Sequence, residues 1–384
     1  MSMCIHCSSA PSLFNKMNNI SECMAFYASQ EAGIILLHYN HTGKLENRRL
    51  PSEGMGIVRI IFIIVSCFVV IENLLVFFAI LNNTRFRSWV YYCIANITLC
   101  DLLTGTAYIV NLCLSGEKTF RITPTLWFLR EGVLFFALAA STFSLLITAM
   151  ERYATMVKPV PYASANKTYR VYCLIGLCWL LASLIGLLPL LGWNCICNFE
   201  KCSTLLPLYS KSYILFCVVM FSIIIIGIVA LYSGIYQLVR SSAKSVASSK
   251  SRQKSVRLLK TVFMIVAAFV VCWSPLFVLL LLDVFCNSAR CSKLHTMEWT
   301  ITLAVVNSAI NPIIYSFGSK DVRRAIVRLL CFCFIKAGTP LPTFLSRSES
   351  VLGASTDSSY RLRESFRNSK LLSPKKTLPK SEGV

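Results

Sequence analysis

Two opposite charges stand on neighbouring positions of this chain, Arg130 and Glu131, at the start of a long apolar stretch. A guanidinium can bind a phosphate through charge-assisted, bidentate hydrogen bonds, and a carboxylate can bind an ammonium group. Because neighbouring residues of a helix differ in direction by about 100°, we expect the two side chains to point apart and to bind different groups. The pair therefore favours a zwitterionic ligand headgroup, although two ordinary charges at a membrane interface would give the same pattern.

Other residues could extend this pair into a binding site for a lipid. Polar contacts could come from the ends of other apolar stretches, at Asn111, Ser115 and Glu298. An apolar chamber below them could hold an alkyl chain, lined by Phe135, Leu138, Trp273, Phe277 and Leu280. The alternative is that these aromatic and aliphatic residues belong only to the core.

A second polar group lies in the middle of the apolar stretches, around the carboxylate of Asp101. Hydroxyl and amide side chains occur at matching depth in other stretches, at Asn73, Ser141, Asn307, Ser308 and Asn311. Hard cations prefer oxygen ligands, so this group suits Na⁺. A water-filled hydrogen-bond network is the alternative interpretation, and the two can coexist. No other cofactor is expected.

Seven apolar stretches must position these residues. Each is close to the roughly 20 residues that a helix needs to cross the hydrocarbon core of a membrane. The stretches are 57–81, 90–114, 132–150, 171–191, 213–238, 258–282 and 299–317. We therefore expect an all-α membrane protein, a seven-transmembrane helix bundle whose polar residues face the interior. The alternating pattern of a transmembrane β-barrel is not present in these stretches.

The composition agrees with a membrane protein. Hydrophobic residues make up 55% of the 384 residues and charged residues only 14%, whereas soluble domains carry roughly 25% charged residues. The net charge of +21 could indicate a nucleic-acid partner, but the basic residues lie between and after the apolar stretches. We therefore expect a lipid bilayer and no nucleic acid among the partners.

The basic residues also predict the orientation. With the N-terminus outside, 26 of the 38 Lys and Arg residues fall on the inner side, as the positive-inside rule requires. The sequons at Asn19 and Asn40 then lie outside, where they could be glycosylated. The predicted organisation is an extracellular segment 1–56, a bundle 57–317 and a cytoplasmic part that follows it.

Two segments follow the bundle. In 318–335, apolar residues recur at helical spacing with Arg and Lys on the other face, which predicts an amphipathic eighth helix on the inner leaflet. Cys331 and Cys333 could be palmitoylated there, or could be free thiols. Residues 336–384 are expected to form a disordered cytoplasmic tail, because Ser, Lys and Arg dominate it, and its Ser and Thr clusters could be phosphorylated.

Eight of the 18 cysteines would lie outside, where disulfides form. Cys195 with Cys202, and Cys286 with Cys291, would each close a small loop, and Cys197 is a rival partner for Cys202. Sequence does not fix this connectivity. It also leaves open the partners of three N-terminal residues, Cys4, Cys7 and Cys23.

Three short motifs occur in a specific order along the apolar stretches. They are Glu151-Arg152-Tyr153, Cys272-Trp273-Ser274-Pro275 and Asn311-Pro312-Ile313-Ile314-Tyr315. Each motif alone is weak, but the combination at these depths is specific, and Pro275 should kink its helix. On these motifs, residues 57–335 resemble the rhodopsin-like (class A) G-protein-coupled receptors.

The resemblance implies how such a receptor switches. In that family the Arg, here Arg152, pairs with its acidic neighbour Glu151 in the inactive state and is released on activation. The sixth helix then swings outward about Trp273 and admits a heterotrimeric G protein, and arrestin binds the tail once it is phosphorylated. The implied switch residues are Glu151, Arg152, Tyr153, Tyr232, Pro275, Pro312 and Tyr315.

Several stretches resemble one branch of that family, the sphingosine 1-phosphate receptors. These stretches are residues 38–45, 127–131, 192–195, 206–209 and 307–312. The resemblance implies that the N-terminal segment caps the ligand site and that Tyr39 and Lys44 bind the phosphate together with Arg130. Glu131 and Asn111 match the residues that bind the ammonium group.

The same resemblance implies a ligand and a location. Related receptors for lysophosphatidic acid carry Gln at the position of Glu131, because their ligand has no amine. Glu131 therefore favours sphingosine 1-phosphate and leaves lysophosphatidic acid as the alternative ligand. A receptor of this kind would lie in the plasma membrane and signal through G proteins, with Gi expected first.

Two positions depart from the wider family. Trp127 stands where a Cys usually bonds to the second outer loop, and Ile224 stands where the fifth helix usually has Pro. Both departures are features of the lipid-receptor branch.

Other classes of membrane protein fit less well. A transporter, the distant alternative, often shows internal repeats, and we find none. An opsin needs a Lys in the seventh span, and 299–317 contains none. An intramembrane enzyme needs a catalytic set, but the four His residues all lie outside the spans, so no enzyme is expected.

Overall fold

The computed structural model describes residues 31–42, 53–82, 89–157, 165–245, 249–285, 299–318 and 320–336. Most of these residues are helical. The helices are α3 (Glu31–His41), α4 (Glu53–Leu81), α5 (Trp89–Leu114), η2 (Gly116–Arg121), α6 (Pro124–Val157), α7 (Ala165–Leu187), η3 (Phe199–Lys201), α8 (Lys211–Ser245), α9 (Ser249–Phe285), α10 (Trp299–Gly318) and α11 (Lys320–Lys336).

Six helices, α4 to α9, are long and apolar enough to cross a membrane. α10 meets the same criterion only when it is counted together with α11. The reason is its polar content, since its 20 residues include Thr300, Thr302, Asn307, Ser308 and Asn311. All five of these side chains are buried, so α10 directs its polar groups into the bundle.

The exposed surface of α4 is apolar. Its exposed side chains include Ile57, Ile60, Ile61, Ile64, Phe68 and Ile71. Soluble proteins rarely expose a continuous apolar surface of this kind, whereas lipid tails accept it. The surface therefore fits a helix that faces the bilayer.

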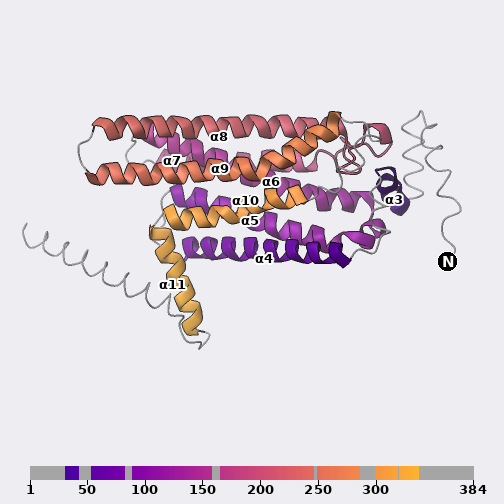
Figure 1. Cartoon of the computed structure of the whole chain (residues 1–384), viewed down its shortest axis with the longest axis horizontal. Helices are drawn as coiled ribbons and strands as arrows, with labels where there is room; N and C mark the ends of the chain where they lie inside the picture. Colours follow the sequence, from indigo (N-terminus) through magenta and orange to yellow (C-terminus); the bar gives the residue numbers. More distant parts are fainter. Residues whose placement is uncertain are drawn as a thin grey trace, which may run out of the picture. The chain divides into compact units, whose positions relative to one another are not determined.

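The long helices lie side by side in one bundle (Figure 1). α4 packs on α5, and α5 packs on α6. α6 packs on α8, α8 packs on α9, and α9 packs on α10, which closes the bundle by packing on α4 and α5. α7 packs against α5 and α6. α6 is the central helix, because 72% of its most apolar segment is buried, whereas 44% or less of the corresponding segment is buried in each of the other spans.

α6 and α7 approach each other at two glycines. A Cβ atom placed on Gly132 would lie 2.7 Å from the backbone oxygen of Gly186, and one on Gly186 would lie 2.8 Å from the backbone oxygen of Gly132. No other residue type fits this contact without moving the helices apart.

Several helices extend beyond the predicted apolar stretches. α6 begins at Pro124 rather than at 132, because Pro is well suited to the first turn of a helix. Residues 127–131 are therefore helical. α7 ends at Leu187, earlier than the predicted 191, and Pro189 follows in the turn beyond it.

One end of the bundle is covered by α3, η2 and the connection between α7 and α8. We call residues 188–210 the 188–210 loop, and this end of the bundle the α3 end (Figure 1). α3 packs on η2 and α6. Within the loop, two isolated bridges pair Asn194 with Tyr209 and Cys202 with Ser210, so the loop folds back on itself.

The described residues divide into two units, the bundle up to Gly318 and α11. α11 covers the predicted amphipathic segment, and Arg324 pairs with Asp321 within it at 3.9 Å.

Candidate functional site

Arg130 and Glu131 lie in the second turn of α6 and bind each other. The Nη2 and Nε atoms of Arg130 donate to the Oε1 atom of Glu131 at 2.7 and 3.1 Å. Their side chains are only 5% and 12% exposed. The expectation that the two side chains point apart is therefore wrong. The long Arg side chain folds back along its helix, because a buried charge without a partner is costly.

Three further groups complete this ion pair. The Nη1 atom of Arg130 donates to the backbone oxygen of Leu114 and to the Thr119 hydroxyl, each at 3.1 Å. The Nδ2 atom of Asn111 donates to the Oε2 atom of Glu131 at 2.8 Å. The structure thus brings the predicted residue Asn111 to Glu131. It adds Thr119, which lies in η2 and was not predicted from the sequence.

Ser115 does not join this network through its side chain. Its hydroxyl donates to the backbone oxygen of Leu112 at 2.8 Å. It therefore belongs to the end of α5. Lys44 and Glu298, the other predicted polar contacts, lie outside the described residues.

α3 places Tyr39 near this network. The hydroxyl of Tyr39 accepts a hydrogen bond from the Trp127 indole at 3.4 Å, and its ring meets Phe120 edge-on at 5.3 Å. Since Trp127 lies one turn before Arg130 on α6, α3 covers the segment that carries the charged pair.

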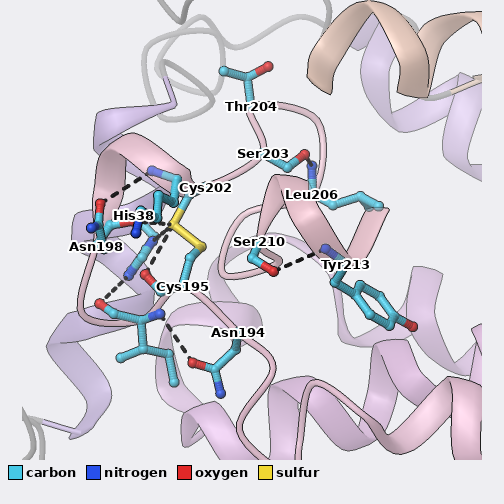
Figure 2. Close-up of a disulfide and its surroundings, with 12 residues drawn as sticks. His38, Asn194, Cys195, Asn198, Cys202, Ser203, Thr204, Leu206, Ser210 and Tyr213 are labelled. Carbon is cyan, nitrogen blue, oxygen red and sulfur yellow. Dashed lines mark hydrogen bonds between the residues drawn. A yellow bond between two sulfur atoms is a disulfide. The ribbon is translucent and has the colours of Figure 1, made fainter. Parts of the chain in front are cut away.

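α3 is also joined to the 188–210 loop through His38 (Figure 2). His38 is fully buried, its Nε2 atom lies 3.1 Å from the backbone oxygen of Ile196, and its ring contacts Phe199 at 4.3 Å. Figure 2 shows His38 beside the sulfur atoms of Cys195 and Cys202. Burial lowers the pKa of His38 to about 4, so the imidazole is neutral at physiological pH.

The structure contains the disulfide Cys195–Cys202, with its Cα atoms 5.5 Å apart. Cys197 is itself disulfide-bonded, so it does not compete for Cys202. His38 and the two bonded sulfurs lie together, but a disulfide offers no thiolate to a metal ion. The predicted pair Cys286–Cys291 lies outside the described residues.

Tyr209 joins the 188–210 loop to α6 through ring contacts. It is fully buried, and burial raises its pKa. Its ring lies 5.4 Å from Trp127, 5.7 Å from Phe128 and 5.4 Å from Phe135, and it stacks on Tyr213 at 5.5 Å. Tyr209 belongs to a stretch that carries the family resemblance, but its packing role was not predicted, because a lone loop aromatic gives no periodic signal.

Below this cluster lie the residues that were predicted to line an apolar chamber. Trp273 on α9 stacks on Phe277 at 5.6 Å, on Phe269 at 5.7 Å and on Phe221 of α8 at 6.0 Å. Leu138 and Leu280 are buried in the same core. The structure therefore places the five predicted apolar residues in one continuous cluster with the aromatic contacts of Tyr209.

A polar group occupies the middle of the bundle. The carboxylate of Asp101, which is fully buried, accepts from the Ser141 hydroxyl at 2.6 Å and from the Asn311 amide at 2.8 Å. Asn73 donates to the backbone oxygen of Ser308 at 3.0 Å, and its own Oδ1 atom has no hydrogen-bond partner among the described residues. Asn307 is buried on α10, but no described contact links it to Asp101.

The family model described as 7 transmembrane receptor (rhodopsin family) matches residues 72–315. Sphingosine 1-phosphate receptor 4 of Mus musculus is 54% identical over 357 residues, which cover 91% of this chain and 92% of that protein. The chain belongs to the sphingosine 1-phosphate receptors of the rhodopsin family. It is therefore a seven-transmembrane receptor and not an enzyme.

Other relatives agree with this assignment. The receptor is 54% identical to sphingosine 1-phosphate receptor 4 of Homo sapiens over 91% of this chain and 93% of that protein. It is 49% identical to sphingosine 1-phosphate receptor 3 of Takifugu rubripes over 78% of each chain. Two short segments, 195–197 and 353–359, also predict a resemblance to subtype 4, and these identities agree with that prediction.

At the end of the bundle opposite α3, the receptor departs from one expectation. The Glu151 carboxylate, which is buried, accepts from the Nε and Nη2 atoms of Arg170 on α7 at 3.0 and 2.9 Å. Among the described residues, the ion pair of Glu151 is therefore with Arg170, and not with Arg152 as predicted. Arg152 instead lies close enough to Tyr232 and Tyr315 to interact with both hydroxyls electrostatically.

The remaining motif residues lie where the helices bend or meet. Pro275 lies inside α9 and Pro312 inside α10, and α9 is visibly bent (Figure 1). A Cβ on Gly234 of α8 would lie 2.8 Å from the ring of Tyr153, so Tyr153 packs directly on α8.

Proposed function

We propose that this receptor binds sphingosine 1-phosphate and signals through heterotrimeric G proteins, with Gi first. It would lie in the plasma membrane with its N-terminus extracellular and its C-terminus cytoplasmic. The observation that carries the proposal is the buried Arg130–Glu131 pair at the α3 end. The two relatives at 54% identity are sphingosine 1-phosphate receptors, which supports the same ligand.

The pair suits a zwitterionic headgroup because each of its charges can exchange partners. The ammonium group of the lipid would replace Arg130 on Glu131, and the phosphate would replace Glu131 on Arg130. Neither buried charge is then left without a partner, which avoids the largest cost of opening a buried ion pair. Asn111 and Thr119 keep the two side chains oriented during the exchange.

The same reasoning disfavours lysophosphatidic acid, the alternative ligand. Its phosphate could take Arg130, but it has no ammonium group for Glu131. A site with a buried polar group discriminates strongly against a ligand that leaves this group unpaired. The alkyl chain of either lipid would pass Phe135 and Leu138 toward Trp273.

Na⁺ is proposed as a bound ion in the middle of the bundle. The residues fit it, since Asp101, Ser141 and Ser308 offer hard oxygens and the Asn73 Oδ1 atom is buried without a partner among the described residues. Na⁺ would supply a charge that offsets the Asp101 carboxylate. Thermal unfolding in NaCl compared with choline chloride tests this, and Asp101→Asn should abolish any difference.

The proposed receptor would also carry covalent modifications on both sides of the membrane. Asn40 is exposed on α3, as a glycan requires, and Asn19 is the second glycosylation candidate. Cys331 and Cys333 are palmitoylation candidates at the end of α11. Arrestin would bind the phosphorylated tail.

The test is G-protein activation in cells that express this receptor, with sphingosine 1-phosphate and lysophosphatidic acid titrated side by side. A saturable response to the first lipid alone supports the proposal. A response to the second lipid alone would overturn the role of Glu131, and no response to either at confirmed surface expression would overturn the ligand.

A further inference from the structure

Asp283 is a buried carboxylate that neither the motifs nor the proposed ligand site uses. It lies on α9, two residues before the last residue of that helix, and is 1% exposed. No ion pair among the described residues involves it. A buried carboxylate needs hydrogen-bond donors or a cation to stabilise it.

All of its donors among the residues that the structure describes come from three consecutive residues of the 188–210 loop. The backbone N–H groups of Thr204 and Leu205 donate to the Oδ1 atom at 2.9 and 3.3 Å. The Thr204 hydroxyl also donates to Oδ1, and the Ser203 hydroxyl donates to Oδ2. Successive backbone N–H groups of this kind form a nest for an anion, and here the anion belongs to α9.

The same three residues are fixed to the rest of the loop. Ser203 follows directly on Cys202 of the disulfide, and its N–H group donates to the backbone oxygen of Tyr209 at 2.9 Å. Its hydroxyl accepts from the N–H group of Leu206 at 2.8 Å (Figure 2). Two hydrogen bonds therefore connect Asp283 to Tyr209, and Tyr209 packs on Trp127, one turn before Arg130.

α9 has a weak point below this attachment. Pro275 lies two turns before Asp283 and removes one backbone hydrogen bond of the helix. The segment from Leu276 to Phe285 can therefore tilt about this point. Asp283, near the end of this segment, is hydrogen-bonded to the 188–210 loop. The loop in turn packs on α6, the helix that carries Arg130 and Glu131.

We propose that Asp283 is a positioning residue that latches the 188–210 loop onto α9, so that a lipid bound at Arg130 and Glu131 acts on α9 through Tyr209. The part concerning the lipid rests on the proposed function. The latch itself does not, and the two are tested separately.

The first experiment needs no lipid. Backbone hydrogen exchange of residues 203–209 is measured by mass spectrometry on the purified full-length receptor and on Asp283→Asn. Asn keeps the size of Asp but removes the charge and one acceptor oxygen, so we expect exchange in this segment about tenfold faster or more. Glu200→Gln, an exposed acid of the same loop, should leave exchange unchanged. Unchanged exchange in Asp283→Asn would overturn the latch.

Two substitutions at Thr204 guard against a variant that fails to fold. Thr204→Ser keeps the hydroxyl, whereas Thr204→Val keeps the shape and loses the hydroxyl. We expect Thr204→Val to follow Asp283→Asn and Thr204→Ser to follow the wild type. Equal behaviour of the two would show that the hydroxyl does not hold Asp283.

The second experiment separates positioning from simple structural support. Binding of labelled sphingosine 1-phosphate and maximal G-protein activation are compared at equal surface expression. A coupling role predicts that Asp283→Asn changes affinity by less than about threefold but lowers maximal activation to about half or less. A loosened loop with both values unchanged would overturn the coupling role. Absence of any wild-type response to this lipid would instead overturn the proposed function, and the exchange result would be unaffected.

Discussion

At the scale of single residues, the two oxygens of Glu131 hold different partners. Oε1 binds Arg130 and Oε2 binds Asn111, so each carboxylate oxygen has a partner within the protein. An ammonium group can take the place of the guanidinium while Asn111 stays bound. In the proposed ligand site, the charge of Glu131, more than its shape, would therefore select the ligand.

Glu131→Gln should weaken the response to sphingosine 1-phosphate by about 10- to 100-fold, because one charged hydrogen bond is worth roughly 1.5–3 kcal/mol. It should also shift preference toward lysophosphatidic acid. The measurement is the midpoint of G-protein activation at equal surface expression. Glu117→Gln, an exposed acid of η2, is the matched control, and a full response of Glu131→Gln to sphingosine 1-phosphate would contradict the assignment.

Residue types were easier to predict than their partners. A charge or amide inside an apolar stretch is visible in the sequence, which is why Asp101, Ser141 and Asn311 were recognised as one group. The direction of a long side chain is not visible, so the Arg130–Glu131 contact was missed. Asp283 was missed because its donors lie about 80 residues away in a loop, and loop contacts leave no periodic pattern.

At the scale of elements, the contact between α6 and α7 depends on two glycines. Gly132→Ala places a Cβ 2.7 Å from the Gly186 oxygen, so the helices must separate. We expect a loss of about 1–3 kcal/mol in stability, the usual cost of overpacking, seen as a lower midpoint of thermal unfolding. Gly176→Ala on α7 has no atom within 4 Å of its new Cβ and should unfold at the wild-type temperature; equal effects of the two would exclude this explanation.

The docking of α3 should depend on pH. The pKa of His38 is about 4 when α3 is docked and near 6.5 when it is not. Docking is therefore fully stable above about pH 6.5 and weakens as pH falls toward 4, by about 1.4 kcal/mol per pH unit in that window. Burial also lowers the pKa of His41, opposed by the charge of Glu200, so both imidazoles act in the same direction.

Hydrogen exchange of residues 33–41 between pH 7.5 and 5 measures this docking once the intrinsic effect of pH on exchange is removed. His38→Gln removes the titrating group but keeps an N–H donor for the Ile196 oxygen. This variant should lose most of the pH dependence. A wild-type receptor with constant protection across this range would show that His38 does not control α3.

The elements themselves were largely predictable from the apolar stretches, but their ends were not. α6 begins eight residues before the predicted stretch, since helical hydrogen bonding continues into the polar segment after Pro124. This extension matters for the site, because it is what makes Arg130 and Glu131 helical. α10 was predicted as the apolar stretch 299–317, although its polar residues keep it below the hydropathy of a span by itself.

At the scale of the whole molecule, the bundle exposes an apolar surface that is suited to contact with lipid. Phe68→Asp on the exposed face of α4 should reduce surface expression strongly, because a charge at mid-membrane costs about 2.5–3.5 kcal/mol on insertion scales. Flow cytometry of an N-terminal tag measures it. Asn82→Asp, exposed at the end of α4, should be neutral, and normal expression of Phe68→Asp would argue against a lipid-facing α4.

The buried imidazole of His38 also has a meaning for a receptor that travels between compartments. At neutral pH it is uncharged and α3 stays docked over the α6 segment. A receptor taken up into an acidifying vesicle would meet a pH near the middle of the titration window. Docking of α3 would become about tenfold less favoured for each pH unit, so a receptor in such a vesicle would uncover the α6 segment more often than one at neutral pH.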